Sequence, residues 1–141
     1  MSRKRPLTIE DFKSIYSRVT RATVDLVIRN EHGTLLSLRH TDGWEGMWHL
    51  PGGTILYREK ISDAIQRIAE EEVGMKVSVE KFLDHIEFLS EESERGYGYS
   101  ISMVFLCKPS EPVPAKSDKY TFFKHLPENI IVEQKNVISK L

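Results

Sequence analysis

Polar and apolar positions alternate through residues 20–30, and a period of two residues predicts a β-strand. Gly33 follows in a turn sequence, and residues 34–39 return as a partner strand, so the two segments form a hairpin. The apolar positions on one face of the first strand are Val24, Leu26 and Ile28.

Apolar residues recur at helical spacing in three other segments. The predicted helices cover residues 9–18, 60–73 and 132–141. Thr8 can cap the first, with Asp11 three residues later, and Gly74 is the residue expected to stop the second.

Four further strands are predicted, and the segments between them are polar or rich in proline. The strands cover residues 48–50, 76–89, 99–108 and 119–126, with an interruption near 80–81. Residues 90–98 are acidic and predict a mobile loop, while 109–114 predict a surface connection. Since strands outnumber helices and do not alternate with them, an α+β fold with a mixed sheet is expected.

The composition limits the classes of protein that fit. A chain of 141 residues is about one domain long, so residues 1–141 are expected to form a single domain in which 1–19 are a tail and a helix. The net charge of −1 gives no case for binding nucleic acid or an anionic membrane, and the basic residues 2–5 are expected to be solvated. Cys107 is the sole cysteine, which excludes an intrachain disulfide. No apolar run reaches membrane-spanning length and no signal peptide is evident, so a cytoplasmic protein is expected.

Three carboxylates end the helix predicted at 60–73. Glu70, Glu71 and Glu72 face the negative end of the helix dipole, which disfavours them by roughly a few tenths of a kcal/mol each. Glu72 also continues the apolar stripe through Ile68, where an ionised group needs a partner. A bound cation such as Mg²⁺ would supply one. The preceding Gly52 and its neighbour glycine allow close backbone approach to a ligand.

This stretch, residues 53–75, resembles the Nudix box, whose pattern joins a glycine loop to a helix rich in glutamates. The matching residues are Gly53, Glu59, Arg67, Ala69, Glu71, Glu72, Gly74 and Met75. One position departs, because Ile68 stands where the family has a glutamate. The resemblance implies a Nudix-type α/β/α sandwich in which the box forms a loop, a helix and a second loop.

The resemblance also implies a metal site. In the family, the last two carboxylates of the box and a loop carbonyl hold the ion, which here are Glu71, Glu72 and the carbonyl of Gly52. The implied cofactor is Mg²⁺, with Mn²⁺ as a substitute. Glu59 is implied in a supporting catalytic role, and Arg67 as the partner of an acidic residue of the box, although an i, i+4 salt bridge to Glu71 would explain Arg67 equally well.

The apolar Ile68 makes this sequence similar to the GDP-mannose mannosyl hydrolase branch of the family, which also has an apolar residue there. In that branch water attacks the sugar carbon, and the metal stabilises the leaving diphosphate. That likeness implies substrate contacts from the N-terminal segment and from the strands, and a catalytic histidine. The residues at these positions are Phe12, Asp25, Arg39 and His85. A strand-end charge explains Arg39 equally well, and a histidine bonded to Asp84 explains His85.

The likeness to this branch is incomplete. Thr54 replaces an arginine of the branch, and Tyr120 stands where the branch has its general-base histidine, so Tyr120 is a candidate substrate contact. His40 and His85 are the alternative imidazoles for a base.

Three functions therefore stay open. The first is a hydrolase acting on a nucleoside diphosphate derivative, such as a nucleotide sugar, at carbon. The second is a pyrophosphohydrolase acting at phosphorus, and the third is a nucleotide-binding regulator without turnover. The N-terminal helix fits either a homodimer interface or packing on its own domain.

Overall fold

The computed structural model describes residues 5–141, so the predicted basic tail at residues 2–5 lies, except for Arg5, outside the described residues. As predicted, strands outnumber helices. In chain order they are α1 (Ile9–Tyr16), β1 (Arg21–Asn30), β2 (Gly33–Leu38), β3 (Trp48–His49), β4 (Gly52–Thr54), α2 (Ile61–Val73), β5 (Val77–Glu87), α3 (Glu91–Arg95), β6 (Ser100–Pro109), β7 (Thr121–Phe123) and α4 (Val132–Ile138).

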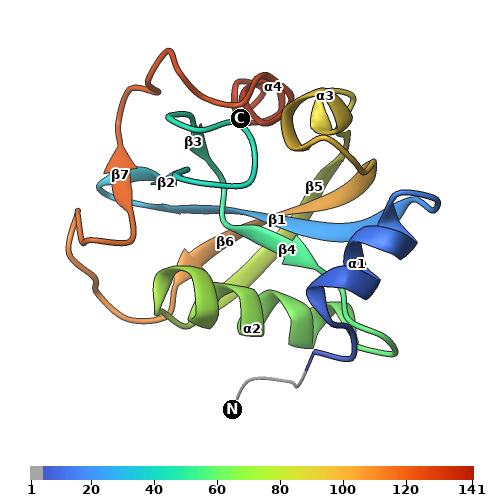
Figure 1. Ribbon diagram of the computed structural model, residues 1–141. Helices are drawn as coiled ribbons and strands as arrows, with labels where there is room; N and C mark the ends of the chain where they lie inside the picture. The colour runs from blue at the N-terminus through green and yellow to red at the C-terminus, as the bar shows by residue number, and fades with distance from the viewer. Residues whose placement is uncertain (1–4) are drawn as a thin grey trace.

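The strands form one mixed sheet in the order β3-β2-β1-β6-β5, and β4 and β7 pair with β1 and β2 (Figure 1). Strands β1 and β6 run parallel, while the other pairs are antiparallel. The interruption expected near residues 80–81 is a register shift in β5 between Val79 and Lys81. The α+β prediction with a mixed sheet is therefore confirmed.

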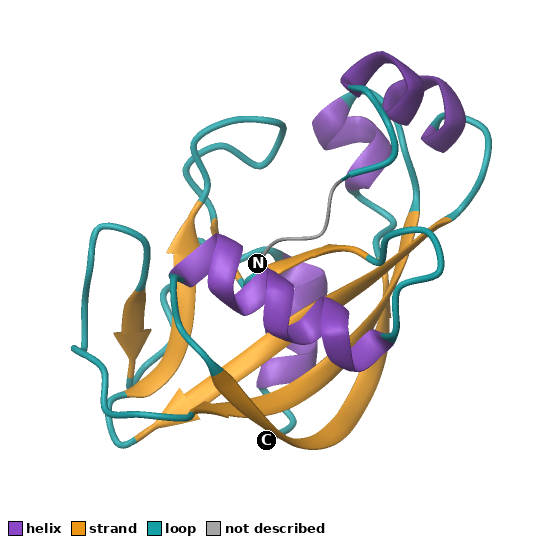
Figure 2. Cartoon of the chain, turned by 90° about the horizontal axis from the view of Figure 1, so that it is seen from below, coloured by secondary structure: helices purple, strands orange, loops and turns teal. Residues whose placement is uncertain are grey.

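Helices cover both faces of the sheet, as predicted for an α/β/α sandwich. The face of β1 that carries Val24, Leu26 and Ile28 packs against α2, which crosses the strands in Figure 2. On the opposite face, Val27 shares a second core with residues of α4. Because β1 is covered on both faces, all its residues from 23 to 28 are buried.

Two local predictions were wrong. The segment predicted as a mobile loop at 90–98 contains α3, which is fixed by Glu91, a side chain only 1% exposed. The acidic composition suggested solvent, but partners from distant strands bury this carboxylate. The first loop of the box, expected from Gly53, instead begins within strand β4, which pairs antiparallel with β1. The last strand is also shorter than the predicted 119–126.

Helix α1 begins as predicted, since the Thr8 hydroxyl accepts a hydrogen bond from the backbone N–H of Asp11 at 3.1 Å. Its apolar face is not buried: Ile9 is 78% exposed, and Phe12 and Tyr16 are half-buried. Packing on its own domain therefore accounts for only part of the amphipathic pattern. Among residues 5–141, none of the helices has the length and apolar character needed to cross a membrane.

Candidate functional site

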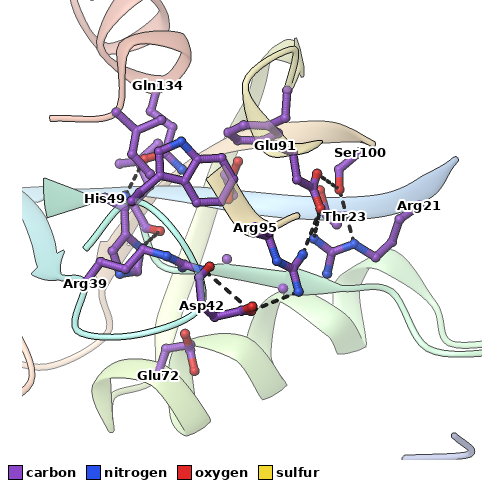
Figure 3. A pocket seen from close by; sticks show the side chains of 17 residues that line it. Arg21, Thr23, Arg39, Asp42, His49, Glu72, Glu91, Arg95, Ser100 and Gln134 are labelled. Atoms are coloured by element: carbon purple, nitrogen blue, oxygen red, sulfur yellow. Dashed lines mark hydrogen bonds and ion pairs between the residues drawn. The ribbon is translucent and has the colours of Figure 1, made fainter. Parts of the chain in front are cut away.

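A cleft of about 150 Å³ opens beside β1 and β4, and charged side chains from four parts of the chain line it (Figure 3). We call it the central cleft. In Figure 3, Arg39 lies at the left of the cleft and Arg95 and Arg21 at the right, and Glu72 lies below them on α2. The charged residues that line it are Arg21, Asp25, Arg39, Asp42, Glu72, Glu91 and Arg95.

Two grooves adjoin the central cleft. The α1 groove, about 500 Å³, is lined by Phe12 and Tyr97 and shares Arg21 and Arg95 with the cleft. The β7 groove, about 640 Å³, is lined by residues 116–121 together with His40, and it shares Glu72 and His49 with the cleft. Both grooves have the size of ordinary small-molecule sites. Together the three spaces suit an elongated ligand with a charged middle.

Asp25 lies at the floor of the cleft and is only 5% exposed. Its cross-strand partner is Gly52, where an added Cβ would lie 2.0 Å from Asp25 Oδ1, so only glycine fits there. Burial raises the pKa of Asp25 to about 7. The Oδ2 atom is buried without a hydrogen-bond partner among the described residues. An orphaned polar atom of this kind marks a place where a ligand can bind.

Arg39 is held in place by its own loop. Its Nε donates to the carbonyl of Gly43 and its Nη2 to the carbonyl of Asp42, both at 2.8 Å. The guanidinium also lies over the Trp44 ring, 5.1 Å from the centroid. A cation fixed in this way is suited to phosphate oxygens, because little side-chain entropy remains to be lost on binding.

The two carboxylates predicted to hold metal are placed differently. Glu72 is exposed at the mouth of the central cleft, and desolvation by its surroundings followed by the like charge of Glu71 raises its pKa. The carboxylate of Glu71 instead pairs with Arg67 at 3.1 Å and with Arg5 at 3.3 Å, and Glu71 does not line the cleft. The structure therefore brings Glu72 and Gly52 together in the lining of the central cleft, while Glu71 lies outside that lining.

These residues fit Mg²⁺ only together with a substrate. Residues 5–141 contain no cluster of three or more aspartate, glutamate, histidine or cysteine side chains that could hold an ion. Mg²⁺ usually keeps several waters and binds through one or two carboxylates plus substrate phosphates. Glu72, which lines the cleft together with Arg39, is the carboxylate that could supply the protein part of such a site.

Glu59 and Arg67 form a buried ion pair beside the cleft. Arg67 Nε donates to Glu59 Oε2 at 2.8 Å, and Nη2 donates to Glu59 Oε1 at 3.0 Å. Arg67 also binds the carbonyl of Thr54 at 2.8 Å, which ties the loop after β4 to α2. Neither side chain lines the central cleft. The arrangement positions the helix that carries Glu72.

The remaining predicted residues lie in three places. Phe12 lines the α1 groove, and Tyr120 lines the β7 groove with its hydroxyl donating to the carbonyl of Pro114 at 3.2 Å. His85 is on β5, with a side chain 62% exposed and 3.5 Å from Asp84. It lines none of the three spaces, so its position gives no support to the predicted catalytic role.

Sequence reasoning missed His49, which lines both the central cleft and the β7 groove. Its Nδ1–H donates to the carbonyl of Leu50 at 2.8 Å, which leaves Nε2 as the acceptor of a neutral ring. Burial, with the charge of Arg39 acting in the same direction, lowers the pKa of His49 to about 4. The signal in the sequence that could have identified it was its position shortly before Gly52 and Gly53.

Arg21 and Arg95 were also missed. Both bind the buried Glu91, at 3.2 Å and 2.8 Å, and both line the central cleft. No local pattern marks Arg21, because Arg21 and Glu91 are 70 positions apart in the chain. Arg95 follows Glu91 by four residues, a helical spacing that the loop prediction for 90–98 left unused.

Comparison with known proteins identifies similar chains. The model of the NUDIX domain family matches residues 19–133. The low-salt glycan biosynthesis protein Agl8 of Haloferax volcanii is 38% identical over 85 residues, which cover 60% of this chain and 54% of that protein. A MutT-like protein of Streptomyces ambofaciens is 32% identical over 108 residues, covering 77% of this chain and 64% of that protein. The chain thus spans less than two thirds of the length of both relatives.

Among solved structures, the MutT NUDIX hydrolase of Burkholderia pseudomallei superimposes with a TM-score of 0.68. The match covers 88% of this chain and 99% of that chain at 21% sequence identity, so it supports the fold.

Proposed function

Because this chain belongs to the NUDIX domain family, we propose that it is a Nudix hydrolase whose substrate is a nucleoside diphosphate linked to a sugar. The observation that carries the proposal is the three-part cleft, in which a charged centre lies between two grooves. The diphosphate binds in the centre against Arg39. The base binds beside the aromatic rings of the α1 groove, and the sugar occupies the β7 groove among side chains that can form hydrogen bonds.

In this proposal the metal is bound jointly by the protein and by the phosphates of the substrate. Glu72 and the Gly52 carbonyl hold Mg²⁺, or Mn²⁺ as a substitute, together with the phosphates, and Glu71 stays paired with its arginines. When bound, the ion supplies Lewis-acid stabilisation of the diphosphate as a leaving group. Arg39 contributes a fixed positive charge to the same oxygens.

Attack at the sugar carbon is the reaction that fits the side chains. Ile68 is 2% exposed and packs under the glycine loop, so no carboxylate is available at that position to activate water for attack on phosphorus. His49 lies where the central cleft meets the β7 groove. In a substrate bound as proposed, the bond between diphosphate and sugar is beside this residue. Its neutral Nε2 accepts the proton from the attacking water.

The relative from Haloferax volcanii supports a substrate of the nucleotide-sugar class, since its name places it in glycan biosynthesis. A panel of nucleotide sugars, each incubated with Mg²⁺ and assayed for free sugar, tests the proposal. In ¹⁸O-labelled water, carbon attack puts the label in the free sugar. Label in a phosphate product would instead establish attack at phosphorus and overturn the proposed reaction.

One observation favours a second candidate function. Glu71, which the family pattern assigns to metal, is held by two arginines, and this arrangement suits a protein that binds nucleotide without turning it over. Nucleotide binding by calorimetry, with no product across the same panel, would establish this alternative.

A further inference from the structure

Asp42 places one carboxylate oxygen between two arginines of the central cleft. Its Oδ2 lies 2.9 Å from Arg95 Nη2 and 3.7 Å from Arg39 Nη2. Figure 3 shows the Arg95 side chain directed at Asp42, which lies on the same loop as Arg39. An oxygen anion therefore already lies at the point where the two guanidinium groups converge.

Arg95 is fixed as firmly as Arg39. Its Nη1 donates to Glu91 and its Nη2 to the Tyr97 hydroxyl, each at 2.8 Å, and the guanidinium lies over the Tyr97 ring at 4.7 Å. The side chain is 7% exposed, and its Nε is buried without a hydrogen-bond partner among the described residues. This cation has an unused donor and cannot move away from the cleft without losing its contacts.

Asp42 is held much less firmly. Its side chain is 51% exposed, and its backbone has a φ of 63°, a conformation that residues other than glycine adopt at some cost. An ion pair of this exposure contributes little to stability. A phosphate group carries more charge and more acceptor oxygens than a carboxylate, so it can replace Asp42 between the same two arginines.

We propose that Asp42 holds the place of a phosphate group between Arg39 and Arg95, and that the diphosphate of the substrate displaces it and binds both arginines. Arg95 thereby becomes a substrate-binding residue. The inference rests on the proposed function for the identity of the ligand, but the anion site itself is defined by the two arginines. Asp42 lowers the affinity for diphosphate and, by the same competition, favours release of the product.

Titration of the ¹⁵N-labelled protein with inorganic pyrophosphate, in EDTA, tests this directly, since no metal or nucleoside then contributes. The Nε–Hε signal of Arg95 is expected to shift on binding. Asp42→Asn is expected to bind pyrophosphate about three- to fivefold more tightly, and Arg95→Lys roughly tenfold more weakly because lysine lacks the forked donor. Asp63→Asn, which removes an exposed carboxylate on α2, is the control for net charge.

Equal or weaker binding by Asp42→Asn, relative to Asp63→Asn, would overturn the proposal. So would an unshifted Arg95 signal in the unaltered protein, a readout that needs no variant to fold. Asparagine tolerates positive φ, so Asp42→Asn is expected to keep the fold. If pyrophosphate binds as expected and no nucleotide sugar is hydrolysed, the proposed function fails and the anion site stands. If a nucleotide sugar is hydrolysed but Asp42→Asn does not change pyrophosphate binding, the proposed function stands and the proposal for Asp42 fails.

Discussion

Asp25 is a carboxylate that the fold buries at an energetic cost. It faces Gly52 across β1 and β4, and it is 5% exposed with a pKa of about 7. In the folded protein the proton is therefore retained to higher pH than in the unfolded chain, where the ordinary value is 3.8. Folding stability from this group is present at low pH and is lost as pH rises from about 4 to about 7. Buried groups with such shifts are typical of functional sites.

Asp25→Asn should remove this pH dependence. The variant gains stability relative to the unaltered protein as pH rises, by up to about 1.4 kcal/mol per pH unit within that window. Urea unfolding at pH 5 and pH 7 measures the difference, for which we expect roughly 2 kcal/mol. Asp63→Asn serves as the exposed control. If the free energies of unfolding of the variant and the unaltered protein differ by the same amount at both pH values, burial does not raise the pKa of Asp25.

His49 gives a second prediction at the scale of a single side chain. If its Nε2 accepts a proton from water, His49→Gln should lower kcat by about 100-fold or more with little change in KM. The kinetics are measured on the nucleotide sugar that the panel identifies. His125→Gln, at an exposed position outside the cleft and grooves, should leave kcat unchanged. A higher KM with unchanged kcat for His49→Gln would show a binding role only.

Among the elements, α3 illustrates the limit of local sequence reasoning. The helix at residues 60–73 was predicted to within one residue, because its apolar period and the stop at Gly74 are both local. Helix α3 was missed because Glu91 is buried by Arg21 from β1 and by Ser100 from β6, which the sequence does not place together. The acidic composition of residues 90–98, taken alone, led to the prediction of a mobile loop.

Glu91→Gln should therefore destabilise the protein well beyond a surface substitution. Glutamine keeps the size but not the charge, so Arg21 and Arg95 lose the carboxylate that pairs with both. Removing one partner of a buried ion pair costs about 3 kcal/mol. Urea unfolding measures the loss, and Glu92→Gln on the exposed side of α3 is the matched control. Equal stabilities of the two variants would show that the pairs contribute nothing.

At the scale of the whole molecule, charged and histidine side chains of the site come from β1, β3, α2, α3 and the loop after β2, with glycines from β4. The sequence predicted Glu72 through the box motif, and Asp25 and Arg39 through the likeness to one branch of the family. The structure brings these three to one cleft. The sequence did not predict Arg95, whose position depends on α3. The metal-binding role of Glu71 stays a prediction, and in the structure its carboxylate pairs with two arginines.

The claim that Glu72 carries the metal-dependent chemistry is tested most directly by comparing Glu72→Gln with Glu70→Gln. The two residues are near neighbours on α2 and both are exposed, but only Glu72 lines the cleft. On the nucleotide sugar that the panel identifies, with saturating Mg²⁺, Glu72→Gln should lower kcat/KM by at least about 100-fold, because a lost metal contact removes several kcal/mol of transition-state stabilisation. Glu70→Gln should keep the parent value. Undiminished hydrolysis by a folded Glu72→Gln protein would contradict the claim that Glu72 carries the metal-dependent chemistry.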